Sequence, residues 1–137
     1  MRLRILAMPI LWGMVTMSNA SAASPLDALH WNSRVLVVVA PAGDAAAEAQ
    51  RRIYQSAQEG MSERSIVLIE ALDDSERSRQ IRSRLSAGGR RFQVFLVGKD
   101  GHTAISSSKP LSAADLFARV DAMPMRRDEM RRSRSTW

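Results

Sequence analysis

Three nearly unbroken apolar stretches organise the chain, at residues 34–40, 65–70 and 92–97. The first is rich in β-branched residues and shows no alternation with polar positions, which is typical of a strand buried on both faces. Residues 102–107 are more polar and follow an Asp-Gly pair at 100–101, a strong hairpin signal. The pattern therefore predicts four strands, and the fourth returns antiparallel along an edge of the sheet.

Amphipathic segments separate these strands. Residues 45–59 predict a helix that is capped by Asp44 and ended by Gly60. The apolar stripe expected on this helix consists of Ala46, Ala49, Ile53 and Ala57.

Two further helices are predicted beyond the second strand. One follows possible caps at 73–75, is rich in arginine, and offers Ile81 and Leu85 as its main apolar contacts. The other begins at Ser112, in a sequence that resembles a capping box, and Pro124 ends the domain. The apolar face of this last helix is Leu116, Phe117, Val120 and Met123.

The resulting order is β-α-β-α-β-β-α, in which a helix joins two parallel strands by a right-handed crossover. This order predicts an α/β, thioredoxin-like single domain over residues 34–124. A truncated doubly wound sheet is the alternative, and the Asp-Gly hairpin argues against it. Residues 23–33 form a lead-in in which Leu26, Leu29 and Trp31 pack as a helical turn. The tail, 125–137, is basic and expected to be disordered or loosely docked.

The first two dozen residues have the organisation of a secretory signal peptide. Arg2 and Arg4 precede a run of about thirteen mostly apolar residues, which is short of the roughly twenty that span a bilayer. The motif at 20–22, Ala-Ser-Ala, predicts cleavage after Ala22. Residues 1–22 are therefore expected to direct the protein to the periplasm or the exterior, with no transmembrane span after cleavage. An uncleaved membrane anchor is the alternative.

Composition excludes several chemistries. The 137 residues include no cysteine, which rules out disulfides, thiolate nucleophiles and cysteine-based metal sites. His30 and His102 are far apart, and neither has a second histidine at ligand spacing. The run at 88–91 lacks the Lys-Ser/Thr of a phosphate-binding loop. We therefore expect no metal and no cofactor.

Charge suggests an anionic partner. The formal net charge is +6, and loss of two arginines with the leader leaves 18 basic against 14 acidic residues, or +4. In an exported protein such a balance favours anionic lipid, polysaccharide or another envelope protein over nucleic acid. The possible anion-binding residues are Arg77, Arg79, Arg82, Arg84, Arg126 and Arg127.

Several blocks together resemble the prokaryotic branch of the DUDES domain, a domain of unknown function. These blocks are residues 31–40, 66–70, 95–101 and 116–127, of which the closing Asp-Ala-Met-Pro-Met-Arg-Arg is the most specific. The resemblance implies a thioredoxin- or peroxiredoxin-like fold, export, and relatives among secreted animal matrix proteins. It implies no established catalytic activity and supplies no catalytic residue.

The sequence thus favours an exported, non-enzymatic binding or interaction module on a redox-inactive scaffold. Thiol exchange needs an attacking thiolate, and the position where the first strand meets its helix, 40–44, holds none. The alternative is an enzyme of unrecognised type that uses Asp44, Asp73 or His102. A convergent polar cluster in an enclosed cleft would distinguish the two.

Overall fold

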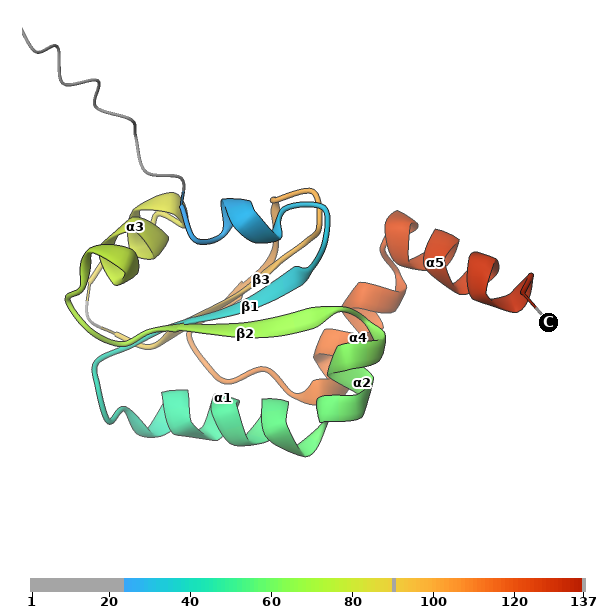
Figure 1. The fold of residues 1–137 in the computed structure, drawn as a ribbon. Helices are drawn as coiled ribbons and strands as arrows, with labels where there is room; N and C mark the ends of the chain where they lie inside the picture. Colours follow the sequence, from blue (N-terminus) through green and yellow to red (C-terminus); the bar gives the residue numbers. More distant parts are fainter. Residues whose placement is uncertain (1–23, 90, 137) are drawn as a thin grey trace, which may run out of the picture.

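A four-stranded mixed sheet forms the centre of the computed structural model, which describes residues 24–89 and 91–136 (Figure 1). The strand order is β2-β1-β3-β4. β1 (Arg34–Val39) is parallel to β2 (Ile66–Ala71) and antiparallel to β3 (Gln93–Val97), and β4 (Thr103–Ser107) pairs antiparallel with β3. The predicted leader and its cleavage after Ala22 lie outside the described residues.

Helices cover both faces of the sheet (Figure 1). α1 (Ala45–Ser56), α2 (Gln58–Glu63) and α4 (Ala113–Asp121) lie on one face. α3 (Glu76–Arg84) and a short 3-10 turn, η1 (Asp27–Leu29), lie on the other. This arrangement explains why every residue of β1 is buried, whereas β4, at the edge, is only partly covered.

Alternate residues of β1 supply the two halves of the core. Leu36 and Val38 pack with the α4 residue Leu116, whereas Val37 faces the α3 residue Ile81. The structure confirms the mixed α/β class, and the order and directions of its strands are those expected of a thioredoxin-like α/β fold.

The hairpin between β3 and β4 forms as the sequence predicted. Gly101 has φ +81°, a left-handed conformation that favours glycine, and the Asp100 side chain accepts a hydrogen bond of 3.0 Å from the His102 backbone N–H. This hairpin brings Lys99 beside the chain that enters β1, because the Trp31 N–H donates to the Lys99 carbonyl at 2.7 Å.

The C-terminal segment differs from the expectation of a disordered or loosely docked tail. Pro124 does not end the structured region but occupies the first turn of an eleven-residue helix, α5 (Pro124–Arg134), where its missing N–H costs nothing. Figure 1 shows α5 projecting from the body beyond α4. None of the helices in the described ranges 24–89 and 91–136 is long and apolar enough to cross a membrane.

Two details of the sequence-based picture are wrong. The predicted helix 45–59 is broken at Ala57, and Gly60 lies inside α2, where an added Cβ would be 2.6 Å from the Phe117 ring. Trp31 does not pack in the lead-in but is 60% exposed and stacks on His30, with ring centroids 4.6 Å apart. Leu26, in contrast, is buried as expected.

Ala46 and Ala57 of the predicted stripe pack against the core, but the fully buried residues of α1 are Ala47 and Gln50, which the stripe did not include. Gln50 is fully buried, and its amide clamps the loop between β4 and α4. Its Oε1 accepts from the Leu111 N–H at 2.7 Å, and its Nε2 donates to the Leu111 carbonyl at 3.0 Å. The sequence did not indicate this role of Gln50, because its partner Leu111 is 61 residues away along the chain.

Replacing this clamp should destabilise the fold. Gln50→Leu leaves the N–H and the carbonyl of Leu111 without their partners, which should lower the free energy of unfolding by about 2 kcal/mol. Urea denaturation measures the change. Gln55→Leu, on the exposed side of the same helix, is the matched control and should change stability by less than about 0.5 kcal/mol. Equal losses in the two variants would contradict the clamp.

Candidate functional site

Asp44, one of the possible catalytic residues, caps the helix that follows it. Its side chain accepts from the N–H groups of Ala46 and Ala47 at 2.9 and 3.0 Å, so it caps α1 as predicted. The loop that carries Asp44 joins β1 to α1.

Asp73 and His102, the other two possible catalytic residues, interact with neighbours close to them in the sequence. Asp73 accepts from the hydroxyls of Ser75 and Ser78 at 2.6 and 2.5 Å, and these hydrogen bonds lower its pKa to about 2. His102 is 87% exposed, with its Nδ1 3.5 Å from Asp100 on the open hairpin turn. The described residues contain no group of three or more side chains suited to holding a metal ion.

The arginines of α3 are partly neutralised by neighbouring acids. Arg79 pairs with Glu76 at 2.8 Å, and Arg82 bonds to the Asp73 carbonyl and lies 3.7 Å from an Asp74 carboxylate oxygen. The remaining two of the predicted anion-binding set on this helix, Arg77 and Arg84, are exposed.

The two predicted anion-binding residues of the tail have opposite environments. Arg127 is exposed, whereas Arg126 is buried and bonded to Glu63 at 2.7 Å and to Asp121 at 3.3 Å. Arg126 is therefore not available to an external anion and does not belong to the predicted anion-binding set. Figure 1 shows α3 and α5, the two helices that carry this predicted set, at different ends of the molecule.

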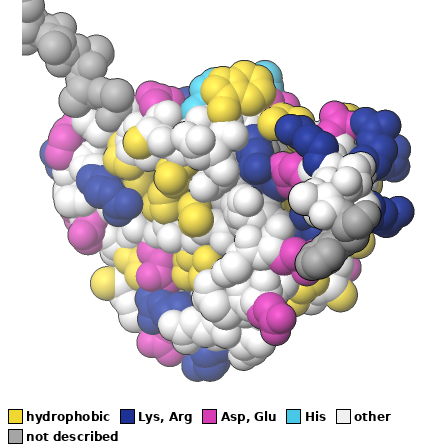
Figure 2. All heavy atoms as spheres, turned by 45° about the vertical axis from the view of Figure 1, so that its right-hand side comes forward, with side chains coloured by type: hydrophobic (Ala, Val, Ile, Leu, Met, Phe, Trp, Pro, Cys, Tyr) yellow, Lys and Arg dark blue, Asp and Glu magenta, His cyan; other side chains and the backbone are white. Residues whose placement is uncertain are grey.

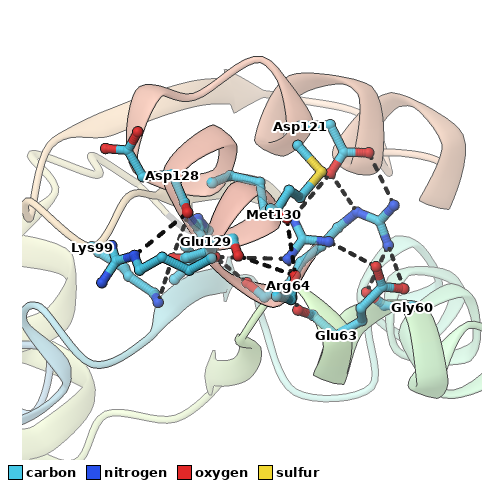
Figure 3. Close-up of polar contacts among 12 residues, drawn as sticks. Gly60, Glu63, Arg64, Lys99, Asp121, Asp128, Glu129 and Met130 are labelled. Carbon is cyan, nitrogen blue, oxygen red and sulfur yellow. Dashed lines mark hydrogen bonds and ion pairs between the residues drawn. The ribbon is translucent and has the colours of Figure 1, made fainter. Parts of the chain in front are cut away.

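A cluster of buried and partly buried charges joins α5 to the body, and its centre is Glu129 (Figure 3). The Glu129 carboxylate accepts from Lys99 Nζ at 2.7 Å and from both terminal nitrogens of Arg34 at 3.2 and 3.3 Å. Arg126 Nη1 lies 3.7 Å from the same carboxylate. We call these four residues the Glu129 cluster.

Arg34 is the most deeply buried charge in this cluster. It is the first residue of β1 and only 1% exposed. Its Nη1 also donates to the Arg64 carbonyl at 2.8 Å, whereas its Nε has no hydrogen-bond partner among the described residues. Buried charges require partners because desolvation is costly, so Arg34 depends on Glu129.

A second set of ion pairs continues the cluster towards α2 and α4. Arg64 donates two hydrogen bonds of 2.9 Å to the Asp121 carboxylate. Its Cζ lies 4.2 Å from the centroid of the Phe117 ring. The hydrogen bond from Arg64 is the main cause that lowers the pKa of Asp121. Arg126 bonds to the same carboxylate and so links the two sets.

Glu129 titrates below its ordinary range although it is partly buried. Burial by itself opposes ionisation, but hydrogen bonds from Lys99 and Arg34 outweigh it and lower the pKa of Glu129. The carboxylate therefore stays charged through mildly acidic pH.

A pocket of about 340 Å³ lies beside the Glu129 cluster, between the β3–β4 hairpin and the junction of α4 with α5. The sequence gave no sign of it, because its wall combines the start of β1, a hairpin and a helix junction. Its lining residues are Arg34, Gly98, Lys99, Asp100, His102, Thr103, Ala104, Arg119, Ala122, Met123, Pro124 and Met125.

The fold and the site define a small mixed α/β domain in which buried ion pairs lie beside a pocket lined by charged and apolar residues. The chain belongs to the family described as Domain of unknown function (DUF4174), which it matches over residues 25–129. The match includes Glu129 and most of the first two turns of α5. No curated protein and no solved structure shows a significant match to the chain.

Removal of the Glu129 charge should weaken the domain in a pH-dependent way. Glu129→Gln leaves the buried Arg34 without its counterion, so we expect the free energy of unfolding at pH 7 to fall by about 2–3 kcal/mol. The pKa of Glu129 is lower in the folded protein than its ordinary value of 4.5. Its contribution is therefore complete above about pH 4.5 and is lost as the pH falls through the lowered value.

Urea denaturation of wild type and variant at pH 7 and at about pH 3 measures this difference, which should shrink at the lower pH. Asp128→Asn is the matched control, because the ion pair of Asp128 among the described residues is with exposed Arg131 on the same helix. It should change stability by less than about 1 kcal/mol. A pH-independent difference for Glu129→Gln would show that the charge is not responsible.

Proposed function

We propose that this protein is an exported, non-enzymatic binding module whose partner is an anionic polysaccharide, and that α5 supplies the main contact. The observation that carries the proposal is the stripe of exposed arginines along α5. A non-enzymatic role is supported because Asp44, Asp73 and His102 are each occupied locally or exposed, at separate places in the fold.

The α5 stripe consists of Arg127, Arg131 and Arg134, which recur at i, i+4 and i+7 and share one side of the helix. Together with Asp128 and Met130 they line a shallow groove. Figure 2 shows basic side chains gathered over this projecting helix. Of the two acids of α5, Glu129 faces inward to Arg34 and Lys99, whereas Asp128 pairs with Arg131 and offsets part of the charge of the stripe.

A polysaccharide suits this surface better than a lipid bilayer does. Helices that lie on membranes insert a substantial apolar face, whereas the large exposed apolar residues of the described chain are Trp31 and Met125. A projecting rod of arginines instead fits a charged polymer that lies along it. Such exposed contacts are screened over about 8 Å at physiological salt, so binding should weaken steeply as salt is added.

Export, a redox-inactive thioredoxin-like ancestry and membership of the prokaryotic DUDES branch are parts of the same proposal. Their support is the leader-like residues 1–22, the absence of cysteine, and a strand order consistent with that fold. A partner in the periplasm or outside the cell would then meet α5 directly.

Heparin, a sulfated polysaccharide, is the probe for the α5 stripe. Wild type should be retained at low salt, and replacing Arg127, Arg131 and Arg134 with Gln should weaken binding. If counterions are released as from other polyanions, the slope of log affinity against log salt should fall by about one per lost contact. A biosensor titration across a salt series measures it.

The matched control replaces the α3 residues Arg77, Arg79 and Arg84 with Gln, which removes the same charge at the other end of the molecule. This variant should lose less affinity than the α5 variant. Equal losses would mean that only net charge matters, and tighter binding to acidic lipid vesicles than to heparin would favour a membrane partner. A wild-type protein that heparin does not retain would refute the proposal.

Processing provides a separate test of export. Mass spectrometry of the protein recovered from the cell envelope or the medium should find a mature chain that begins near Ala23. A recovered protein that still carries residues 1–22 would overturn export with cleavage, and would leave the binding surface on α5 unaffected.

A further inference from the structure

The pocket beside the Glu129 cluster is framed by a helix N-terminus that lacks a cap. α5 has eleven residues, its N-cap residue Met123 offers no side-chain hydrogen bond, and its first turn contains no acid. Such a terminus presents unpaired N–H groups and a partial positive charge. The residues at this terminus, Met123, Pro124 and Met125, all line the pocket.

Arg34 gives a second and independent indication of a ligand. It lines the same pocket and is 1% exposed, yet its Nε has no hydrogen-bond partner among the described residues. A buried donor without an acceptor is costly, and an unmade bond of this kind in a native fold calls for a partner. Arg34 therefore brings a guanidinium with an unsatisfied donor to the wall of the pocket.

The net charge around the pocket suits a ligand that carries one negative charge. Three cations line the pocket, Arg34, Lys99 and Arg119, whereas Asp100 lies in the wall and Glu129 directly behind it. Three positive against two negative charges leave one positive charge, to which the α5 terminus adds a fraction. A dianion would be less well compensated than a monoanion.

The rest of the wall is apolar and the volume is small. Ala104, Ala122, Met123 and Met125 contribute hydrocarbon surface. A volume of about 340 Å³ lies near the lower end of the range for small-molecule sites. Arg119 spans from α4 to β4 by donating to the Ala104 carbonyl at 3.1 Å, so a guanidinium lies at the boundary between apolar and polar walls.

We propose that this pocket binds a small organic monocarboxylate, with the carboxylate at the first turn of α5 and the apolar body against the alanines and methionines. The site is separate from the α5 stripe and does not depend on polysaccharide binding. Arg34 and Lys99 hold Glu129 and also border the ligand, so the Glu129 cluster orients the cations that the ligand would meet.

Hexanoate is the probe, and titration of the ¹⁵N-labelled protein followed by NMR is the measurement. Saturable shifts should appear at the Met125 and Arg126 amides. Hexanamide, which has the same shape without the charge, should bind at least about tenfold more weakly, as expected for loss of a charge-assisted contact. Inorganic phosphate should also bind more weakly than hexanoate.

Variants separate a specific site from general charge. Met125→Asp places a carboxylate at the α5 terminus and should abolish hexanoate binding without lowering the melting temperature, because an acid is favourable there. Arg119→Gln should weaken binding about tenfold. The matched control Arg127→Gln removes an exposed arginine outside the pocket and should leave binding unchanged.

Three results would overturn the assignment. They are hexanamide or phosphate binding as tightly as hexanoate, equal weakening by Arg119→Gln and Arg127→Gln, and no saturable shift at Met125 and Arg126. None of these results bears on heparin retention, so the two proposals fail independently.

Discussion

The need of one buried guanidinium for a counterion organises the C-terminal part of this protein. Arg34 begins the central strand and is almost fully removed from water, so its charge must be matched nearby. Glu129 supplies that match from α5, 95 residues later in the chain. The first strand is thus tied to the last helix by charge, and Lys99 adds the β3–β4 hairpin to the same contact.

This arrangement divides the structure into two kinds of packing. The sheet and its covering helices are joined by apolar residues such as Leu36, Ile81 and Leu116. α5 is attached mainly by directional polar contacts, with Arg126 and Glu129 turned inward and a row of arginines turned outward. These inward ion pairs hold α5 in one orientation, so the cluster sets which side of α5 faces solvent and how its N-terminus meets the pocket.

Much of the fold could be read from local patterns. The continuous apolar run of β1, the Asp-Gly hairpin and the caps at Asp44 and Ser112 all depend on near neighbours, and all form as predicted. The predictions failed where distant partners decide the outcome. Gln50 can be buried because its amide hydrogen-bonds to the backbone of Leu111. Arg126 can be buried because its guanidinium donates to Glu63 and Asp121.

By itself the sequence determined the mixed α/β class, the order of the elements and the lack of thiol chemistry, because periodicity, turn residues and the absence of cysteine are local properties. Only the tertiary structure decided that the basic tail is a helix, that Arg126 faces inward, and that a pocket lies beside Arg34. The sequence does not reveal whether a charged side chain is surrounded by water or paired with a carboxylate. The folded chain alone brings residues 34, 99 and 129 within hydrogen-bond distance.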